Sequence, residues 1–214
     1  MTVTPYGLAI HTASASLGLA VNNFAGDSRA QVWDLGRETS NLLHHYLVEF
    51  LQPQTWSDVG FLAVAKGPGG FTGTRIGVVT ARTLAQQLNV PLFAISTLAG
   101  VAWQTTKMLD QSVAIAVQLR AQRGEVFGGI YQPCQGDSGV KTLQPLLPDA
   151  VLSLEQWQHY LTHGSTPYHL VDAEDAIADS VAALLELAHL DWVQGQRPHW
   201  SAALPFYGQH PVES

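Results

Sequence analysis

The fold of this chain follows from one stretch of its sequence, Lys66-Gly67-Pro68-Gly69-Gly70-Phe71-Thr72-Gly73-Thr74-Arg75. An almost unbroken apolar run over 59–66 leads into it, which is typical of a strand buried on both faces. Apolar residues at helical spacing follow it over 74–88. Glycines allow backbone conformations that are closed to residues with a Cβ. The stretch therefore predicts a glycine-rich turn from a buried strand into a helix, at the centre of an α/β protein.

Periodicity and turn-forming residues divide the rest of the chain in the same way. Strands are expected over 6–12, 18–23, 30–35, 59–66, 92–96, 113–118, 125–131, 140–146 and 168–171. Helices are expected over 40–51, 74–88, 97–108, 153–163 and 176–188. Ser153 and Gln156 have the spacing of a capping box at the start of the fourth helix. The first half thus reads βββαβαβα and the second half βββαβα.

Two similar runs of elements indicate a duplicated two-lobe α/β protein. Among common architectures, the one built in this way is the actin/hexokinase/Hsp70-type fold. We expect a first lobe over 1–108, which carries the glycine turn, and a second, smaller lobe over 109–214. The tail from Arg197 onward is rich in proline and is expected to be irregular and to pack back on the body.

The charged residues limit the classes of function. The net charge is −7, from 10 lysines and arginines against 17 aspartates and glutamates, and the sequence has no basic run. Proteins that bind nucleic acid unaided usually carry a basic surplus, so any contact with nucleic acid would need a partner. Charged residues make up 13% of the chain, which is about half the usual share. A surface with few charges favours a subunit of an assembly.

Cysteine content and hydropathy favour a cytoplasmic protein without membrane contact. Cys134 is the only cysteine, so no internal disulfide can form, as is usual in a reducing compartment. The first residues lack the basic cluster of a targeting signal. The longest apolar run, 61–65, is far shorter than the roughly 20 residues of a membrane span.

The chemistry of the glycine turn leaves two interpretations open. Backbone N–H groups of Gly67, Gly69 and Gly70, with Arg75 nearby, can form a site for phosphate or carboxylate at a helix N-terminus. Alternatively, the glycines only allow close packing. The turn matches neither a Walker loop nor a dinucleotide-binding fingerprint.

Two helices carry unusual faces and predict a protein–protein interface. The helix over 40–51 has six apolar positions within ten residues, and the helix over 74–88 has small residues at every fourth position. Glycine inside a helix costs about 1 kcal/mol against alanine, so another element must approach closely there, either the sheet beneath or another helix. The predicted interface residues are Leu42, Leu43, Tyr46, Leu47, Phe50, Gly77, Ala81 and Ala85. Charged substitutions at Leu43 or Leu47 are expected to abolish association and to leave the protein folded.

The motif over 67–77, GPGGFTGTRIG, resembles the GPGSFTGxRIG signature of the TsaB (YeaZ) family, with Gly70 in place of the usual serine. Further stretches that are similar to the family lie over 8–10, 40–43, 91–98, 124–127 and 205–207. The resemblance spans nearly the whole chain, and its glycine signature is highly specific.

The resemblance implies a two-lobe fold of the actin/hexokinase/Hsp70 type and a role in making threonylcarbamoyladenosine, the modified nucleoside beside the anticodon of certain tRNAs. It implies a non-catalytic partner of the transferase TsaD, bound through the first two helices, with TsaE as an accessory ATPase. A homodimer through the same surface is common in the family when TsaD is absent. The chain would then have no cofactor of its own, and ATP, metal and tRNA would be bound by other parts of the complex.

Two positions depart from the pattern that the fold uses for nucleotides. His11 stands in the first lobe where an aspartate is usual, and Arg120-Ala121-Gln122 stands in the second lobe where Asp-Ala-Arg is expected. Imidazole cannot replace a carboxylate as a hard Mg²⁺ ligand. We therefore predict no catalytic residue and no nucleotide site. Two alternatives stay open, a small kinase or phosphotransferase of the same fold and a metallopeptidase.

Two further groups of residues can be explained without a metal. His159 and His163 lie four residues apart near the expected end of a helix, where imidazolium is tolerated. Asp172, Glu174 and Asp175 lie between a strand and a helix, where acids favour caps and the helix dipole. We therefore predict no metal site.

Overall fold

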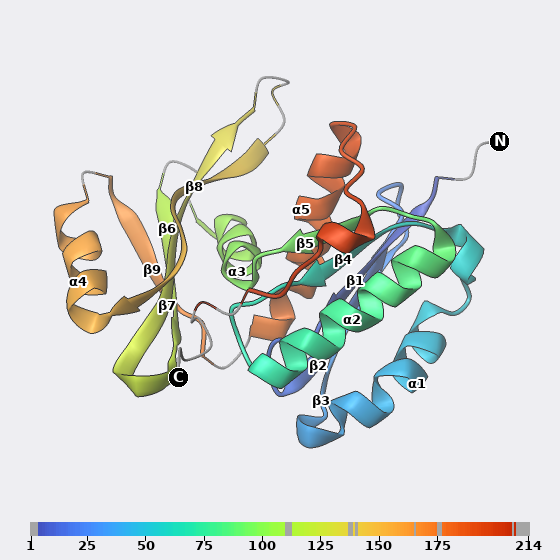
Figure 1. Cartoon of the computed structure of the whole chain (residues 1–214). Coiled ribbons are helices and arrows are strands. Elements are labelled where there is room, and N and C mark those ends of the chain that lie inside the picture. Colours follow the sequence, from blue (N-terminus) through green and yellow to red (C-terminus); the bar gives the residue numbers. More distant parts are fainter. Residues whose placement is uncertain are drawn as a thin grey trace.

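The described strands form two separate mixed sheets in the computed structural model (Figure 1). The structure describes residues 4–109, 113–136, 139, 141–164, 166–174, 177–206 and 208. The strands are β1 (Tyr6–His11), β2 (Ser16–Asn22), β3 (Ser28–Asp34), β4 (Val59–Ala65), β5 (Leu92–Ile95), β6 (Ala114–Arg120), β7 (Glu125–Gln135), β8 (Lys141–Ser153) and β9 (Tyr168–Asp172). The α-helices are α1 (Thr39–Leu51), α2 (Phe71–Leu88), α3 (Thr97–Thr106), α4 (Leu154–His163) and α5 (Val181–Val193). Short 3₁₀ turns lie at Gly36–Glu38, Trp56–Asp58, Gln122–Gly124, Ile177–Ser180 and Trp200–Ala202.

The two sheets repeat one topology. The first has the order β3-β2-β1-β4-β5, with antiparallel pairing from β3 to β1 and parallel pairing from β1 to β5. The second has the order β8-β7-β6-β9, again with two antiparallel pairs followed by a parallel one. The second sheet therefore matches the first four strands of the first sheet. This confirms the duplicated two-lobe fold of the actin/hexokinase/Hsp70 type.

Helices and sheets alternate in layers, because side chains of a strand point to opposite faces in turn (Figure 1). Leu8 and Ile10 of β1 pack with α1 and α2 on the outer face of the first sheet. Ala9 of the same strand packs with α5 on the other face. Ile115 of β6 faces α3, and Ala116 faces Trp157 of α4. The apolar core thus continues from the outer helices of one lobe to the outer helix of the other.

The C-terminal part of the chain returns to the first lobe. Helix α5, which chain order places in the second lobe, 109–214, contacts both sheets: Leu185 and Ala188 pack against the first sheet, and Leu184 packs in one cluster with β6 of the second. The tail follows the same route: Leu92 N donates to Pro198 O at 3.2 Å, and Phe206 N donates to Lys66 O at 2.6 Å. The lobes are therefore joined by α5 and the tail as well as by the segment between α3 and β6.

Most differences from the expected elements lie at their ends. The second helix begins at Phe71, three residues before the predicted start. Strand β8 extends to Ser153 in spite of its prolines, because it is an edge strand in which missing N–H donors are tolerated. The capping box of α4 is confirmed, with Gln156 N donating to Ser153 Oγ at 3.1 Å and Ser153 N donating to Gln156 Oε1 at 2.9 Å.

None of the helices in the described ranges has the length and apolar character that a membrane span requires.

The small residues of α2 face the chain's own sheet. A Cβ added at Gly77 would lie 2.2 Å from Thr12 Oγ1, and one added at Gly73 would lie 2.1 Å from Thr12 O. Ala81 and Ala85 are completely buried in the same direction. The element that packs against the small residues of α2 is therefore the sheet beneath it and not another helix.

Substitution of Gly73 by alanine tests this close approach. In an isolated helix the change would stabilise by about 1 kcal/mol. Here the added Cβ meets the backbone oxygen of Thr12, so we expect a loss of about 2 kcal/mol in the free energy of unfolding, measured by urea titration. Thr72→Ala in the same exposed first turn is the matched control, with an expected change within about 0.5 kcal/mol. A stabilised Gly73→Ala variant would contradict the packing described above.

Candidate functional site

The first candidate site is the outer surface of α1 and α2, which lie side by side over the first sheet (Figure 1). Most of the residues assigned to an interface from the sequence point the other way, into the core. Buried residues among them are Leu43, Leu47, Phe50, Gly77, Ala81 and Ala85. This corrects the assignment for these six, because helical spacing identified the apolar faces but not what covers them. It also changes the expectation for charges at Leu43 or Leu47, which would disrupt folding as well as any association.

The residues that remain accessible on these helices define what we call the outer helix surface: Leu42, Tyr46, Val48, Phe71 and Val79. Val48, Phe71 and Val79 are 54%, 56% and 60% exposed, and Leu42 and Tyr46 are half-buried. Exposed apolar side chains on two adjacent helices are suited to a protein partner. Of this set, only Leu42 and Tyr46 were predicted from the sequence.

The second candidate site is a cavity of about 500 Å³ between the lobes. Three turns meet there: the turn after β1, the glycine turn before α2, and the end of β6. Its lining residues are Ala13, Ser14, Ala15, Gly69, Gly70, Phe71, Thr74, Leu119, Arg120, Ala121, Gln122, Phe127, Glu174, Ile177 and Phe206. The fold therefore brings together the glycine turn and the segments that follow β1 and β6, although they lie far apart in the sequence.

The glycine turn uses some of its backbone groups within the protein. Gly70 N donates to Ala13 O at 2.6 Å, and Gly67 O accepts from Thr97 N at 2.9 Å. Gly67 has φ +96°, a conformation that favours glycine. Of the four anion-site candidates, Gly69 and Gly70 line the cavity, whereas the Arg75 guanidinium lies 4.0 Å over the ring of Phe71 on the exposed side of α2. The turn is thus built around packing contacts with the loop after β1.

Polar groups in the cleft are few. The exposed Arg120 has its Nε 3.7 Å from Glu174 Oε1. Asp172 accepts a hydrogen bond from Gln118 Nε2 at 3.1 Å and lies on the exposed side of the second sheet. The hydroxyl of Thr74, which the sequence analysis did not consider, is buried and has no hydrogen-bond partner among the described residues.

The other acidic and histidine candidates do not form a metal site in the part of the chain that the structure describes. No group of three or more metal-ligating side chains occurs within these residues. Asp175 lies outside the described residues. The rings of His159 and His163 stack at 4.2 Å between centroids on the exposed side of α4, and His163 Nδ1 lies 3.1 Å from His159 O.

His11 lies at the end of β1, directly beneath the cleft, and is completely buried. Burial lowers the pKa of its imidazole to about 3, because a charged ring would be removed from water. Its Nε2 has no hydrogen-bond partner among the described residues. A neutral, buried imidazole at this position provides no negative charge that could bind the metal ion of a nucleotide.

The burial of His11 predicts a pH dependence of stability. The unfolded ring binds a proton near its ordinary pKa, about 6.5, whereas the folded ring stays neutral down to about pH 3. The unfolded state therefore binds more protons between these limits, and stability must fall as the pH is lowered. From pH 7 to pH 4 we expect this residue to contribute a loss of about 3 kcal/mol.

Urea titrations at pH 7 and pH 4 measure this contribution. His11→Leu should remove it, whereas His44→Gln, a change at an exposed histidine of α1, should keep it. Equal pH dependence in wild type and His11→Leu would show that the ring is not buried as described.

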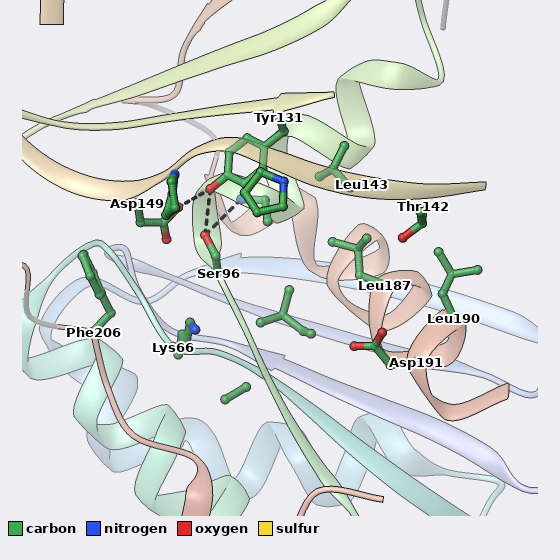
Figure 2. Close-up of a pocket in the computed structure, with 15 residues that line it drawn as sticks. Lys66, Ser96, Tyr131, Thr142, Leu143, Asp149, Leu187, Leu190, Asp191 and Phe206 are labelled. Carbon is green, nitrogen blue, oxygen red and sulfur yellow. Dashed lines mark hydrogen bonds between the residues drawn. The ribbon is translucent and has the colours of Figure 1, made fainter. Parts of the chain in front are cut away.

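A third feature was missed by the sequence analysis. Tyr131 of β7 donates a hydrogen bond to Asp149 of β8, and Ser96 Oγ of the first lobe lies 3.3 Å from the same tyrosine oxygen. These side chains line a separate cavity (Figure 2). No local pattern marks them, because the three residues are far apart in the sequence and only the fold brings them together.

Comparison with known proteins supports the two-lobe architecture. A solved structure described as YeaZ from Pseudomonas aeruginosa has a TM-score of 0.76 and covers 95% of this chain and 99% of that chain at 24% identity. A second, described as an uncharacterized protein with similarity to peptidase YEAZ from the same organism, has a TM-score of 0.75 and covers 96% and 100%. These likenesses establish the fold.

Sequence comparisons identify the family. A family model described as TsaD, tRNA N6-adenosine threonylcarbamoyltransferase, matches residues 51–178. The tRNA threonylcarbamoyladenosine biosynthesis protein TsaB of Bacillus subtilis is 36% identical over 110 residues, which are 51% of this chain and 44% of that protein. TsaB of Escherichia coli is 32% identical over 127 residues, 58% of this chain and 54% of that protein. The alignments thus span about half the length of these curated relatives. Because the family model covers more than half of the chain and the relatives share one name, the chain belongs to this family, as a member of its TsaB (YeaZ) group.

Proposed function

We propose that this chain acts in the formation of threonylcarbamoyladenosine on tRNA as a non-catalytic subunit that binds a TsaD-type transferase. The observation that carries the proposal is the outer helix surface, where Val48, Phe71 and Val79 are exposed on two helices whose other faces are fixed in the core. A rigid surface of this kind binds a partner with little loss of conformational entropy. The names of the curated relatives supply the pathway.

The cleft supports a subunit that does not perform the chemistry itself. The two positions at which this fold holds acidic residues for a nucleotide carry His11 and Arg120. His11 is buried with a lowered pKa, and Arg120 is a cation near Glu174. Neither side chain supplies the carboxylate oxygens that Mg²⁺ prefers. In this proposal ATP and metal are bound by TsaD-type and TsaE-type partners.

Charge supports the same division of roles. With a net charge of −7, the chain repels the phosphates of tRNA and relies on the rest of the complex to hold the nucleic acid. In the absence of the transferase, the outer helix surface would be covered by a second copy of the chain, so a homodimer and the complex would compete for the same residues.

A kinase or phosphotransferase is the rival function, and one observation favours it. The cavity of about 500 Å³ lies where the turn after β1 and the end of β6 meet, and such a volume is sufficient for a small ligand. Titration of the isolated chain with ATP and Mg²⁺ distinguishes the two functions. Saturable binding with phosphoryl transfer would favour the enzyme over the subunit.

Charged substitutions on the outer helix surface test the interface. Val48→Glu combined with Val79→Glu should weaken binding to the transferase at least tenfold, because two carboxylates would lose water against an apolar partner. Isothermal titration calorimetry measures the affinity, and circular dichroism checks the fold. Leu154→Glu, at a residue of α4 that is 53% exposed, is the matched control and should bind like the wild type. Equal affinity of the double variant and the control would place the interface elsewhere.

Reconstitution tests the function itself. TsaD, TsaE, ATP, threonine, bicarbonate and the enzyme that forms threonylcarbamoyl-adenylate are mixed with unmodified tRNA, with and without this chain. We expect modified tRNA only with the chain present, and a reduced yield with the double variant. Equal modification without the chain would overturn the proposal.

A further inference from the structure

A second cavity, of about 400 Å³, is lined by residues of both lobes (Figure 2). Its walls come from the ends of β4 and β5, the start of α3, strands β7 and β8, and the C-terminal part of α5. Phe206 of the tail lines this cavity as well as the cleft. The volume is in the range of pockets that hold small organic ligands.

One wall of this cavity is held in place by a hydrogen bond within the second lobe and by another between the lobes. Tyr131 donates to Asp149, and Ser96 Oγ lies 3.3 Å from the tyrosine oxygen. Ser96 is itself fixed, because its side chain accepts from Ala99 N at 3.1 Å as the N-cap of α3. Burial and the neighbouring Asp149 raise the pKa of the Tyr131 phenol, so it remains a donor. This polar wall is therefore preorganised.

The charges around the cavity do not balance. Asp149 accepts a hydrogen bond from Tyr131. Burial raises the pKa of its carboxyl, whereas the hydrogen bonds from Ser96 and Tyr131 and the charge of Lys66, which lines the same cavity, act in the opposite direction. Asp191 of α5 accepts only from Gln196 Nε2, at 3.2 Å, among the described residues. No cationic side chain of the described residues lies within 4 Å of it. Two carboxylates, those of Asp149 and Asp191, thus line the cavity together with one cationic side chain, Lys66.

The surroundings of Asp191 make this imbalance significant. The residue is half-buried, and burial raises the pKa of its carboxyl, since the charged form loses water. Figure 2 shows its carboxylate directed into the cavity, with Leu187 and Leu190 beside it and Leu143 on the opposite wall. A half-buried carboxylate with a single hydrogen bond and no cation beside it can accept further charge-assisted hydrogen bonds from a cationic ligand.

We propose that this cavity binds a small organic cation, a protonated aliphatic amine. Its ammonium group pairs with Asp191, and its alkyl part packs against Leu187, Leu190 and Leu143. The ammonium group pairs with the carboxylate. The alkyl chain is buried against the leucines, which a metal ion or a free ammonium ion could not do because neither has an apolar part. The site is independent of the proposed role in tRNA modification, because the outer helix surface is not part of it.

Binding of n-butylamine to the full chain tests the proposal at pH 7. Ligand-observed and protein-observed NMR measure the affinity and locate the site. We expect saturable binding, with shifts of the amide signals of Ile95, Leu143 and Leu187. Butyrate carries the opposite charge and n-butanol carries none, so both should bind at least tenfold more weakly.

Two variants test whether the Asp191 carboxylate binds the ammonium group of butylamine. Asp191→Asn keeps the shape of the side chain and should weaken butylamine binding about tenfold, with butanol binding unchanged. Asp34→Asn, a change at an exposed aspartate at the end of β3, is the matched control and should bind like the wild type. Absence of saturable butylamine binding would overturn the proposal, and so would equal affinity of Asp191→Asn and the control, or shifts confined to residues outside this cavity.

Discussion

The close approach of α2 to the loop after β1 is the contact on which the rest of this structure depends. The Thr12 hydroxyl donates to Gly73 O at 2.7 Å, and Gly77 leaves room for the same side chain. A Cβ at either glycine would move the helix away from the sheet. This contact sets the position of α2, and with it the glycine turn, the floor of the cleft and the height of the outer helix surface above the sheet.

The two lobes are held together by several kinds of contact. Ser96 of the first lobe and Tyr131 of the second share a hydrogen bond across the interface, and α5 packs apolar side chains against the first sheet. The tail adds a backbone hydrogen bond from Phe206 to Lys66. In a protein whose lobes close on a nucleotide, the bound nucleotide itself contacts both lobes and holds them together. Here side chains and backbone of the chain itself supply these contacts, which is consistent with His11 and Arg120 at the positions where acids are usual.

The sequence was sufficient to predict the order of elements, because buried strands and amphipathic helices have distinct periods and glycine or proline marks most ends. It was less informative about what each face contacts. The spacing of Leu43, Leu47 and Ala81 is the same whether a sheet or a partner covers them, and only the packing shows that the sheet does. The position of α5 between the two sheets was also beyond the sequence, because an apolar helix does not specify which sheets it contacts. The group of Tyr131 and Asp149 could not be predicted, since it depends on strand pairing between β7 and β8.

The two faces of α1 differ in burial, so that one helix serves both folding and the association that we propose. Leu43 and Leu47 are fully buried and hold the helix on the sheet, whereas Val48, next in the chain, points about 100° away and is 54% exposed. In the proposed function, substitutions one residue apart therefore affect different properties, stability in one case and partner binding in the other. Because the inner face fixes the helix, the outer face needs no ordering when a partner arrives, and a modest number of exposed apolar side chains is enough for a specific contact.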